Sequence, residues 1–366
     1  HPNVPHLRFS EFHGEWEKCK LGDIAEFSTA RISSVKLDCK NYVSTENMLQ
    51  DFQGVVEAKS VPNETNVISF TCGDILISNI RPYLKKVWKA TFDGGCSSDV
   101  FVLQATDTVA KDYLHYAVAN DKFINYVMSG AKGVKMPRGD KNQMRTYQLS
   151  LPSIQEQYKI AKLLTLLDER IATQSKLIEK LESLIKGIAQ HCIRELINGW
   201  EYVRLGNICK ITTGKLDANA QVENGQYPFF TCAERPFNID CYAFDTEALL
   251  ISGNGANLGY INYYKGKFNA YQRTYVLDHF SVNIQYVKWA LKVLLPQRIA
   301  IEKSSSNTPY IVLSTLADLK IPIPNNSKQN HIADLMMSFE RKLSTQLVLS
   351  DLYNKQKQYL LRQMFI

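Results

Sequence analysis

The chain has 366 residues, of which 45% are hydrophobic and 22% charged, so we expect a globular protein of two or three domains. Its formal net charge of +7 is mild and no segment is a basic tail, so any nucleic-acid footprint has to be local. No stretch approaches the roughly 18 apolar residues that span a bilayer, and the N-terminus lacks a signal-peptide pattern. We therefore expect a cytoplasmic protein that does not contact a membrane.

The eight cysteines have no CxxC spacing and no regular histidine partner. This pattern predicts reduced thiols and no metal site.

The most informative feature of the sequence is an internal repeat. Around Trp16 the chain reads WEKCKLGDIAEFSTAR, and around Trp200, 184 positions later, it reads WEYVRLGNICKITTGK. The match resumes at a spacing of 172 positions, where LSLP at 149–152 corresponds to IPIP at 321–324 and Gln157 to Gln329. Two copies of one unit predict a pseudo-twofold arrangement that could grip a duplex at two places.

The two copies are expected to fold as mixed α/β domains over residues 1–152 and 199–324. β-branched and aromatic residues between glycines predict strands, and longer apolar periodicity predicts helices. In the first copy this gives strands at 74–78, 84–92 and 98–103 and a helix at 112–128. In the second it gives strands at 248–252, 260–264 and 271–277 and a helix at 284–295.

Each domain is followed by a long predicted helix, at 153–198 and 325–366. The first opens with a capping box, Ser153-x-x-Glu156, and ends at Asn198-Gly199. Its apolar residues keep the 4,3 spacing of a coiled-coil seam: Ile160, Leu164, Leu167, Ile171, Gln174, Ile178, Leu181, Ile185, Ile188 and Cys192. In the second helix Lys328 replaces Glu156, and the 172 spacing gives a weaker seam that Leu349 and Leu352 are expected to help fill: Ile332, Met336, Phe339, Leu343, Gln346, Ser350, Tyr353, Lys357, Leu360 and Met364.

The two long helices are expected to pack on each other. About 40 residues span about 60 Å, which is too long a seam for one compact domain to bury. The predicted fold is therefore α+β, with two pseudo-symmetric mixed domains separated by two long antiparallel helices that form a coiled coil. Gln174 and Gln346 are expected to meet near the crossing and fix its register; the alternative is that both face solvent.

Two basic clusters in the first domain are candidate DNA contacts. The cluster at 78–89 carries cations next to Tyr83 and Trp88, and a solvated strand face is an equally good interpretation. The cluster at 132–145 has two glycines and a proline, and we interpret it as a flexible basic loop that contacts a duplex. The candidates are Arg81, Lys85, Lys86, Lys132, Lys135, Arg138, Lys141 and Arg145.

The second domain offers polar loops at matching positions. SGNGANLG at 252–259 has GxGxxxG spacing and is followed by a strand pattern, so a dinucleotide site is not expected there. The stretch 303–309 corresponds to the loop from Lys132 to Pro137, with Pro309 matching Pro137 at the 172 spacing. The candidates are Asn254, Asn257, Lys265, Gln272, Arg273, Lys303 and Asn307. Arg and Lys pair with guanine, whereas Asn and Gln pair with adenine. The first domain is therefore expected to read its half-site mainly through guanine contacts, and the second domain mainly through adenine contacts.

Catalytic signatures are missing from the sequence: it has no GxSxG, HExxH or GxxxxGK[ST] motif. We therefore expect no enzyme activity from this chain. A fused nuclease–methyltransferase is one alternative, but it would need a cofactor loop or an NPPY-like tetrapeptide. A coiled-coil structural adaptor that does not read DNA is the other.

The chain resembles, over essentially its whole length, the specificity subunit of type I restriction-modification systems. The resemblance is carried by LRFSEFHGEWEKCKLGDIAEF at 7–27, GDILISNIRP at 73–82 and LPSIQEQYKIAKLLTLLDERI at 151–171. In the second copy it is carried by WEYVRLGNICKITTG, ALLISGNG and IPIPNNSKQNHIADLM.

The resemblance implies two target recognition domains, each of which reads half of a split sequence in double-stranded DNA, with the helices setting the gap. It also implies an adaptor for two methyltransferase subunits, which bind S-adenosyl methionine and methylate a flipped adenine. Two restriction subunits, which translocate and cut with ATP and Mg, would complete the assembly. No cofactor is expected on this chain.

Overall fold

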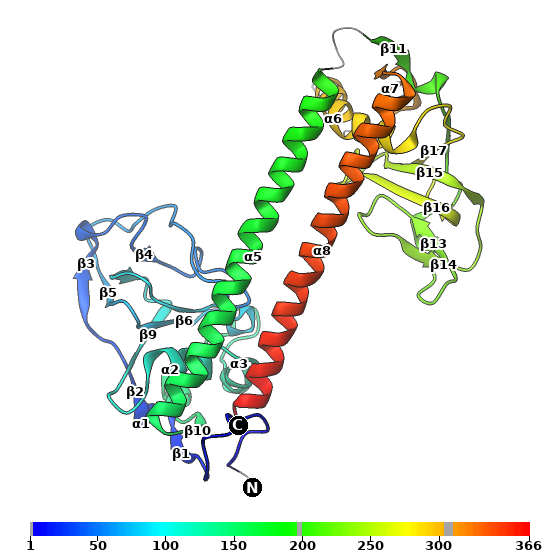
Figure 1. Cartoon of the computed structure of the whole chain (residues 1–366). Coiled ribbons are helices and arrows are strands. Elements are labelled where there is room, and N and C mark those ends of the chain that lie inside the picture. Colours follow the sequence, from blue (N-terminus) through cyan, green and yellow to red (C-terminus); the bar gives the residue numbers. More distant parts are fainter. Residues whose placement is uncertain (1–2, 196–199, 304–309) are drawn as a thin grey trace. The chain divides into compact units, whose positions relative to one another are not determined.

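The computed structural model describes residues 3–195, 200–303 and 310–366. The chain divides into two compact units. Unit 1 comprises residues 1–175 and 349–366, and unit 2 comprises residues 176–348. Each unit holds one mixed sheet-and-helix domain and part of each of two long helices, α5 and α8 (Figure 1).

Unit 1 contains two four-stranded sheets, ordered β2-β9-β6-β7 and β3-β5-β8-β4, and a β1-β10 pair. Their pairings are antiparallel except for β4 with β8. The strands are β1 Glu17–Lys20, β2 Ala25–Phe27, β3 Arg31–Ser33, β4 Tyr42–Val43, β5 Asn66–Phe70, β6 Ile75–Ser78, β7 Val87–Lys89, β8 Gly94–Cys96, β9 Val100–Ala105 and β10 Gln148–Leu151.

Two of the elements predicted for unit 1, one helix and one strand, differ from the structure. The helix expected at 112–128 is broken, because the Asn120 side chain accepts a hydrogen bond from the Phe123 N–H (3.0 Å) and starts a second helix. The strand expected at 84–92 is shorter, because Lys85 has a left-handed backbone (φ 54°). The helices are α1 Leu21–Ile24, α2 Lys111–Val118, α3 Asp121–Ser129 and α4 Lys141–Arg145, with 3₁₀ turns η1 Ser34–Lys36 and η2 Pro82–Leu84.

Unit 2 contains a six-stranded sheet, ordered β12-β17-β15-β16-β13-β14, and a β11-β18 pair. The strand expected at 271–277 starts only at Thr274, so Tyr271–Arg273 is a connection. The elements are β11 Glu201–Arg204, β12 Lys210–Thr213, β13 Tyr227–Phe230, β14 Phe237–Ile239, β15 Phe244–Ser252, β16 Ile261–Ala270, β17 Thr274–Asp278, β18 Lys320–Ile323, α6 Ile284–Lys303, α7 Leu313–Ala317, η3 Leu205–Asn207 and η4 Ala218–Ala220.

The internal repeat of the sequence reappears as repeated strand pairing. β1 pairs antiparallel with β10 so that Glu17 lies opposite Leu151. β11 pairs with β18 in the same way, with Glu201 opposite Ile323. The two spacings found in the sequence, 184 and 172 positions, therefore belong to the two strands of one pair, and the loops between them account for the difference.

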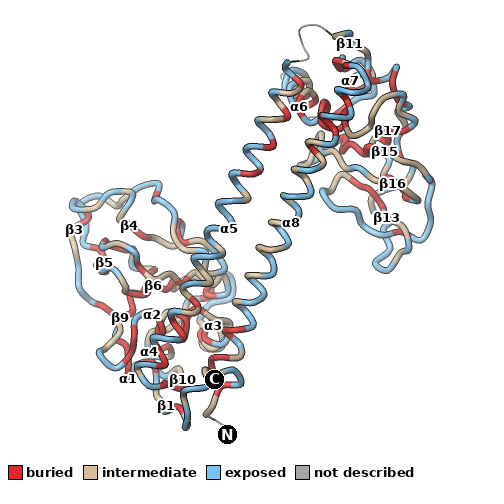
Figure 2. Tube along the Cα trace, in the orientation of Figure 1, coloured by how far each residue is buried: buried red, intermediate tan, exposed pale blue. Residues whose placement is uncertain are grey.

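The long helices run over Ile154–Arg194 (α5) and Asn326–Met364 (α8). All the predicted seam residues of both are buried or half-buried, whereas Leu166, Leu177 and Leu184 beside the seam are exposed. Figure 2 shows burial recurring along α5 at intervals. Leu349 is half-buried as expected, but Leu352 is 53% exposed, so its assignment to the seam was wrong.

Within unit 1, the start of α5 lies against the end of α8. The Lys357 ammonium is 2.6 Å from the Asp168 carboxylate, and Arg170 Nε donates to the Tyr353 hydroxyl at 3.0 Å. Because the partner's number falls as the residue number in α5 rises, the two segments are antiparallel. No helix within the described parts of the chain is long and apolar enough to cross a membrane.

Within unit 2, the end of α5 shares a core with the start of α8, and Leu181 and Ile185 belong to the same buried cluster as Ile332 and Met336. Gln174 is buried and Gln346 half-buried. They belong to different units, so their meeting stays a prediction.

Candidate nucleic-acid interface

In unit 1 a buried glutamine attaches the domain to the start of α5. Gln157 Oε1 accepts the backbone N–H of Ala110 at 2.8 Å, and its Nε2 donates to the carbonyl of Pro152 at 3.0 Å. The Tyr113 hydroxyl donates to the carbonyl of Ser150 at 3.3 Å. These bonds satisfy buried backbone groups at the junction between α2, β10 and α5.

Unit 2 repeats the same attachment at the start of α8. Gln329 Oε1 accepts the N–H of Asn283 at 3.0 Å, and its Nε2 donates to the carbonyl of Pro324 at 2.8 Å. The buried Tyr286 hydroxyl donates to the carbonyl of Pro322. The shared glutamine therefore has one structural role in both copies.

A carboxylate further along each long helix forms a second attachment. In unit 1, Asp168 accepts from the Tyr116 hydroxyl at 2.8 Å. In unit 2, the corresponding Glu340 accepts from Lys288 Nζ at 2.6 Å and Lys292 Nζ at 3.1 Å. Burial lowers the pKa of Lys288, and Glu340 acts against that shift. The carboxylate thus occupies the same position on both long helices, whereas its hydrogen-bond donors differ between the units.

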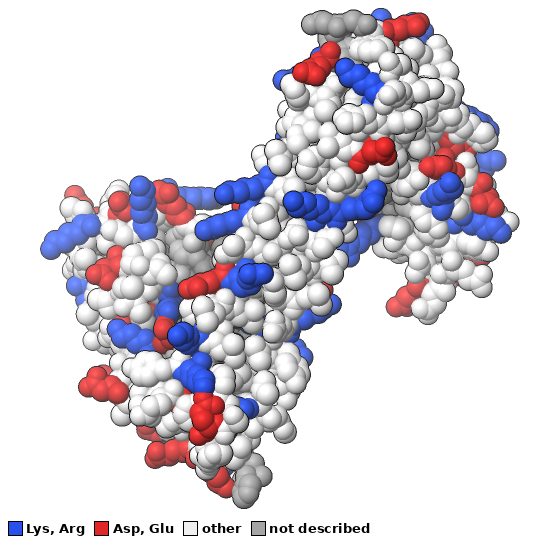
Figure 3. All heavy atoms as spheres, in the orientation of Figure 1, with Lys and Arg blue, Asp and Glu red and all other residues white. Residues whose placement is uncertain are grey.

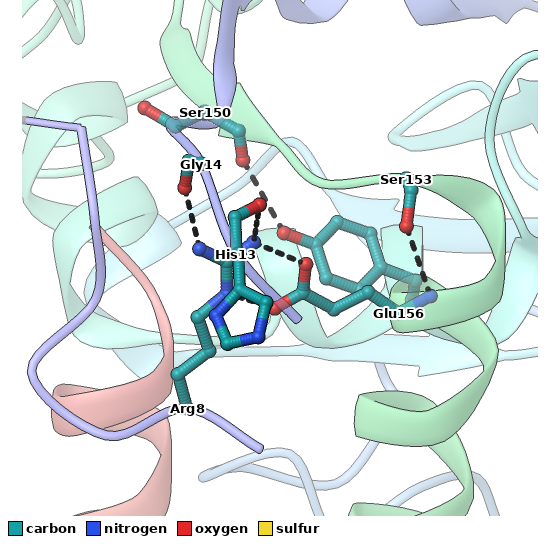
Figure 4. Close-up of polar contacts among 7 residues, drawn as sticks. Arg8, His13, Gly14, Ser150, Ser153 and Glu156 are labelled. Atoms are coloured by element: carbon teal, nitrogen blue, oxygen red, sulfur yellow. Dashed lines mark hydrogen bonds and ion pairs between the residues drawn. The ribbon is translucent and has the colours of Figure 1, made fainter. Parts of the chain in front are cut away.

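The start of α5 carries a bidentate ion pair (Figure 4). Arg8 Nε and Nη2 each lie 2.8 Å from one oxygen of Glu156, whose side chain is only 1% exposed. Arg8 also donates to the carbonyls of His13 and Gly14. Only half of the expected capping box is seen: Ser153 Oγ accepts the Glu156 N–H at 3.4 Å, while the Glu156 carboxylate binds Arg8.

The first candidate DNA-contacting surface is the end of β6 with the loop that packs on it. Arg81 N–H donates to the carbonyl of Pro137 at 2.8 Å, and Gly139 N–H to that of Asn79 at 3.0 Å. Lys132 and Arg138 exchange two backbone hydrogen bonds of 3.0 and 2.9 Å, which close residues 132–138 into a hairpin. Arg81, Lys132 and Arg138 are thus brought together.

The hairpin's cations are oriented and exposed. Arg138 Nη1 lies 3.0 Å from Asp99 Oδ1, and its side chain is 53% exposed. Lys132 Nζ lies 3.6 Å from Asp140, and its side chain is 85% exposed. Lys135 is exposed near the tip. Such exposed pairs contribute little to stability, so the cations can exchange partners for phosphates at small cost.

The sequence predicted that residues 141–145 belong to a flexible loop. This prediction was wrong, because they form helix α4. The Asp140 carboxylate caps it by accepting the N–H groups of Asn142 (2.7 Å) and Gln143 (3.3 Å), which lowers the Asp140 pKa. Lys141 Nζ lies 4.7 Å from the Phe101 ring centre. Burial, and then the nearby Arg145, lower the Lys141 pKa.

Arg145 itself packs over the Phe27 ring at 5.8 Å. Lys141 and Arg145 therefore cover core aromatic rings, and they present less free charge than the hairpin does.

Two of the lysines in the cluster at 78–89 also bind other groups of the protein. Lys85 pairs with Asp121 at 2.9 Å, and Lys86 Nζ donates to the carbonyl of Thr45 at 2.6 Å. Burial, and then Arg81, lower the pKa of Lys86. Trp88 packs on Phe70 and Phe92 with ring centres 6.1 and 5.1 Å away, so its ring belongs to the core of unit 1.

The candidate surface of unit 2 is built at the end of β15. Gly253 N–H donates to the carbonyl of Arg273, and Ile311 N–H donates to that of Gly253, both at 2.9 Å. A cavity of about 310 Å³ opens here, lined by Gln272, Arg273, Tyr310 and neighbouring residues. Exposed Gln272 and Arg273 thus lie at one place.

The other candidates of unit 2 are dispersed. Asn254 follows Gly253 in the chain. Asn257 Nδ2 donates a hydrogen bond to the carbonyl of Cys232 at 3.1 Å. Lys265 lies within β16, opposite Glu247, with their charged groups 3.5 Å apart. The Lys303 side chain and Asn307 lie outside the described residues.

The two surfaces correspond position by position. Asn79 N–H bonds the Asp99 carbonyl in unit 1 as Gly253 N–H bonds that of Arg273 in unit 2. Gly139 and Ile311, 172 positions apart, pack on the ends of β6 and β15. Asp99 and Tyr310 are not among the site residues predicted from the sequence. The 172 spacing pairs Tyr310 with Arg138, but only strand register identifies Asp99.

In the view of Figure 3, basic and acidic side chains are interspersed over unit 1 and do not form one basic face. The described ranges hold no group of three or more His, Cys, Asp or Glu arranged for a metal ion. A nucleic-acid contact would therefore rely on local clusters such as the hairpin.

The comparisons with known proteins agree on one family. The sequence model of the type I restriction modification DNA specificity domain matches residues 13–183 and 197–348. The chain is 44% identical over 135 residues to the type I restriction enzyme EcoDI specificity subunit of Escherichia coli, covering 37% of this chain and 30% of that protein. It is 24% identical over 345 residues, 87% of each chain, to a putative type I specificity subunit of Mycoplasma pneumoniae.

The fold is also shared with a solved structure. The crystal structure of a type I restriction-modification S subunit from M. genitalium superposes with a TM-score of 0.69 at 17% identity, covering 99% of each chain. This chain spans less than two thirds of the length of the E. coli protein and of two further curated relatives.

The chain belongs to the type I restriction-modification DNA specificity family. The predicted fold class, two repeated mixed domains with long helices, is confirmed. Specificity subunits are the non-catalytic components of type I systems, in agreement with the expectation that this chain is not an enzyme by itself.

Proposed function

We propose that this chain reads a split DNA target, with one domain for each half-site. The observation that carries the proposal is the repeated placement of exposed polar and basic residues at the ends of β6 and β15. Under this proposal residues 1–152 and 199–324 are the two target recognition domains. Residues 153–198 and 325–366 set the gap, with Gln174 and Gln346 fixing the helix register.

The proposed contacts differ in kind. Arg81, Lys132, Lys135 and Arg138 supply phosphate and guanine contacts in the first domain, because they are exposed around one hairpin. Gln272 and Asn254 would supply adenine contacts in the second domain, and Arg273 a phosphate or guanine contact. Lys85, Lys86, Lys141, Arg145 and Asn257 hold intramolecular partners, so their contribution would be smaller. Lys265 forms an exposed pair with Glu247, as Lys132 does with Asp140, and stays a candidate phosphate contact. Lys303 and Asn307 remain candidates from the sequence alone.

Two methyltransferase subunits are proposed to dock on the outer faces of the long helices. Support comes from large apolar side chains exposed there: Tyr158, Leu166, Leu177, Leu184, Leu347, Val348, Leu352 and Tyr359. Apolar residues that recur on an exposed face are typical of a protein–protein interface. S-adenosyl methionine would then bind to these partners, and ATP and Mg to the restriction subunits.

Two experiments test the proposed function. Mapping methylated adenines in the source genome should reveal two half-sites at fixed spacing, and a second half-site without an A·T pair would contradict its adenine preference. Separately, Arg138→Glu should weaken duplex binding by the assembled complex and lower its salt dependence. Unchanged binding in a salt titration would favour the alternative, a structural adaptor that does not contact DNA.

A further inference from the structure

The tip of the Lys132–Arg138 hairpin carries an apolar residue that no other residue of the described chain covers. Val134 is fully exposed (101% relative accessibility), and Met136 is 46% exposed. Gly133, with a left-handed backbone (φ 97°), makes the turn that presents this tip. Single exposed apolar residues are ordinary on protein surfaces. A role for Val134 therefore has to be inferred from the residues that surround it.

Backbone hydrogen bonds hold the hairpin that carries Val134, and exposed cations surround it. Four backbone hydrogen bonds of 2.8 to 3.0 Å join Lys132 to Arg138 and residues 137–139 to the segment 79–81 that follows β6. Pro137 is buried beneath the tip. The hairpin therefore projects as a fixed element, with Arg81, Lys132, Lys135 and Arg138 exposed at its base and sides.

Such a shape matches the major groove. The groove is about 12 Å wide and admits a two-stranded ribbon, and phosphates line both of its edges. Cations at the sides of the hairpin would bind those phosphates while the tip faces the base edges. The apolar group on the base edges in this groove is the 5-methyl of thymine, which apolar side chains contact.

Resting on the proposed function, we infer that Val134 determines specificity by packing on the 5-methyl group of a thymine in the half-site read by unit 1. Lys132, Lys135 and Arg138 position the hairpin, with Arg138 held by Asp99 at 3.0 Å. Loss of the Val134 side chain should then relax sequence preference at one base pair and leave the salt dependence of binding unchanged.

The experiment removes methyl groups from both sides of the contact. Each thymine of the first half-site is replaced in turn by deoxyuridine, and duplex affinity of the full chain, assembled with its methyltransferase subunits, is measured at fixed salt. We expect one replacement to weaken wild-type binding roughly fourfold, the factor for one buried methyl group. Val134→Ser should lose the same factor on normal DNA and be insensitive to that replacement.

Val35 provides the matched control, because it is also a strongly exposed valine of unit 1 (74%) and lies on η1. Val35→Ser should behave as wild type in every duplex. The inference is overturned if Val134→Ser and wild type respond identically to all replacements, or if the first half-site contains no thymine. Failure of the wild-type complex to prefer its target over scrambled DNA would instead overturn the proposed function.

Discussion

Gln157 and Gln329, 172 positions apart, make the same two hydrogen bonds, each accepting one backbone N–H and donating to one proline carbonyl. Glutamine suits the position because its amide supplies an acceptor and a donor at one time. Glutamate offers only acceptors when ionised, and leucine offers neither. The repeat thus preserves a device that attaches each domain to its helix.

Replacing Gln157 by Leu should destabilise unit 1 by about 2 kcal/mol, because the Ala110 N–H and the Pro152 carbonyl lose their partners in a buried site. Amide hydrogen exchange at Ala110 should accelerate accordingly. Gln358→Leu, on an exposed face of α8, is the control and should leave that exchange rate unchanged. Equal exchange rates for Ala110 in all three proteins would contradict the assigned role.

Replacing Arg8 by Leu should cost about 3 kcal/mol of unfolding free energy, since it leaves the nearly inaccessible Glu156 carboxylate without its cation. The double variant Arg8→Leu/Glu156→Leu should recover much of this loss, because no buried charge remains. Denaturant unfolding of the wild type and the single and double variants measures the coupling. The exposed pair of Lys159 and Glu11 provides the comparison, and its disruption should cost below about 1 kcal/mol.

Stability should depend on pH through His115, whose Nδ1 is buried without a hydrogen-bond partner in the described chain. Burial lowers its pKa from 6.5 to about 4, assisted by Lys357 and Lys89 and opposed by Asp168 and Asp112. Between these pH values the unfolded chain binds a proton that the folded chain does not, so stability falls as pH decreases from 6.5 to 4. The loss in unfolding free energy is at most roughly 3 to 4 kcal/mol.

The measurement for His115 is the difference in unfolding free energy between wild type and His115→Gln across pH 4–8. The difference should be flat above about pH 7 and should shift against the wild type below 6.5. A pH-independent difference would show that His115 is not held neutral. Carboxylates that titrate in the same range affect both proteins alike and cancel.

Replacing Lys135 by Ala should lower the slope of log K against log salt by about 0.9, the value for one lost phosphate contact. The effect should be similar for specific and scrambled duplexes, because phosphate contacts carry no direct sequence information. Lys36→Ala, an exposed lysine on η1, is the control and should leave the slope unchanged. Equal slopes for the two variants would remove Lys135 from the interface.

Replacing Leu184 by Glu should weaken binding of a methyltransferase subunit by about tenfold or more, because the proposed docking would bury the new charge. Leu184 is exposed on α5, so the chain itself should remain folded. Val56→Glu, at an exposed valine that is not part of either long helix, is the control. Calorimetry with the partner subunit would compare the two, and unchanged affinity for both would contradict docking at Leu184.

Local patterns predicted some elements well and others poorly. The seam of α5 was predictable because one spacing repeats over many turns, and every residue named for it is covered. The break at Asn120 was not, because its apolar neighbours continue the helical pattern while its side chain caps a new helix. Lys141 and Arg145 suggested a loop with free charge, but aromatic rings from β2 and β9 lie beneath them.

The sequence by itself determined the duplication, the two long helices and the family, because these depend on residue spacing that repeats along the chain. Only the tertiary structure decided which charges are free, since partners such as Asp121 for Lys85 or Thr45 for Lys86 come from distant segments. It also decided that Val134 stands uncovered at a hairpin tip. Exposure depends on which segments pack together, and short-range patterns do not contain that information.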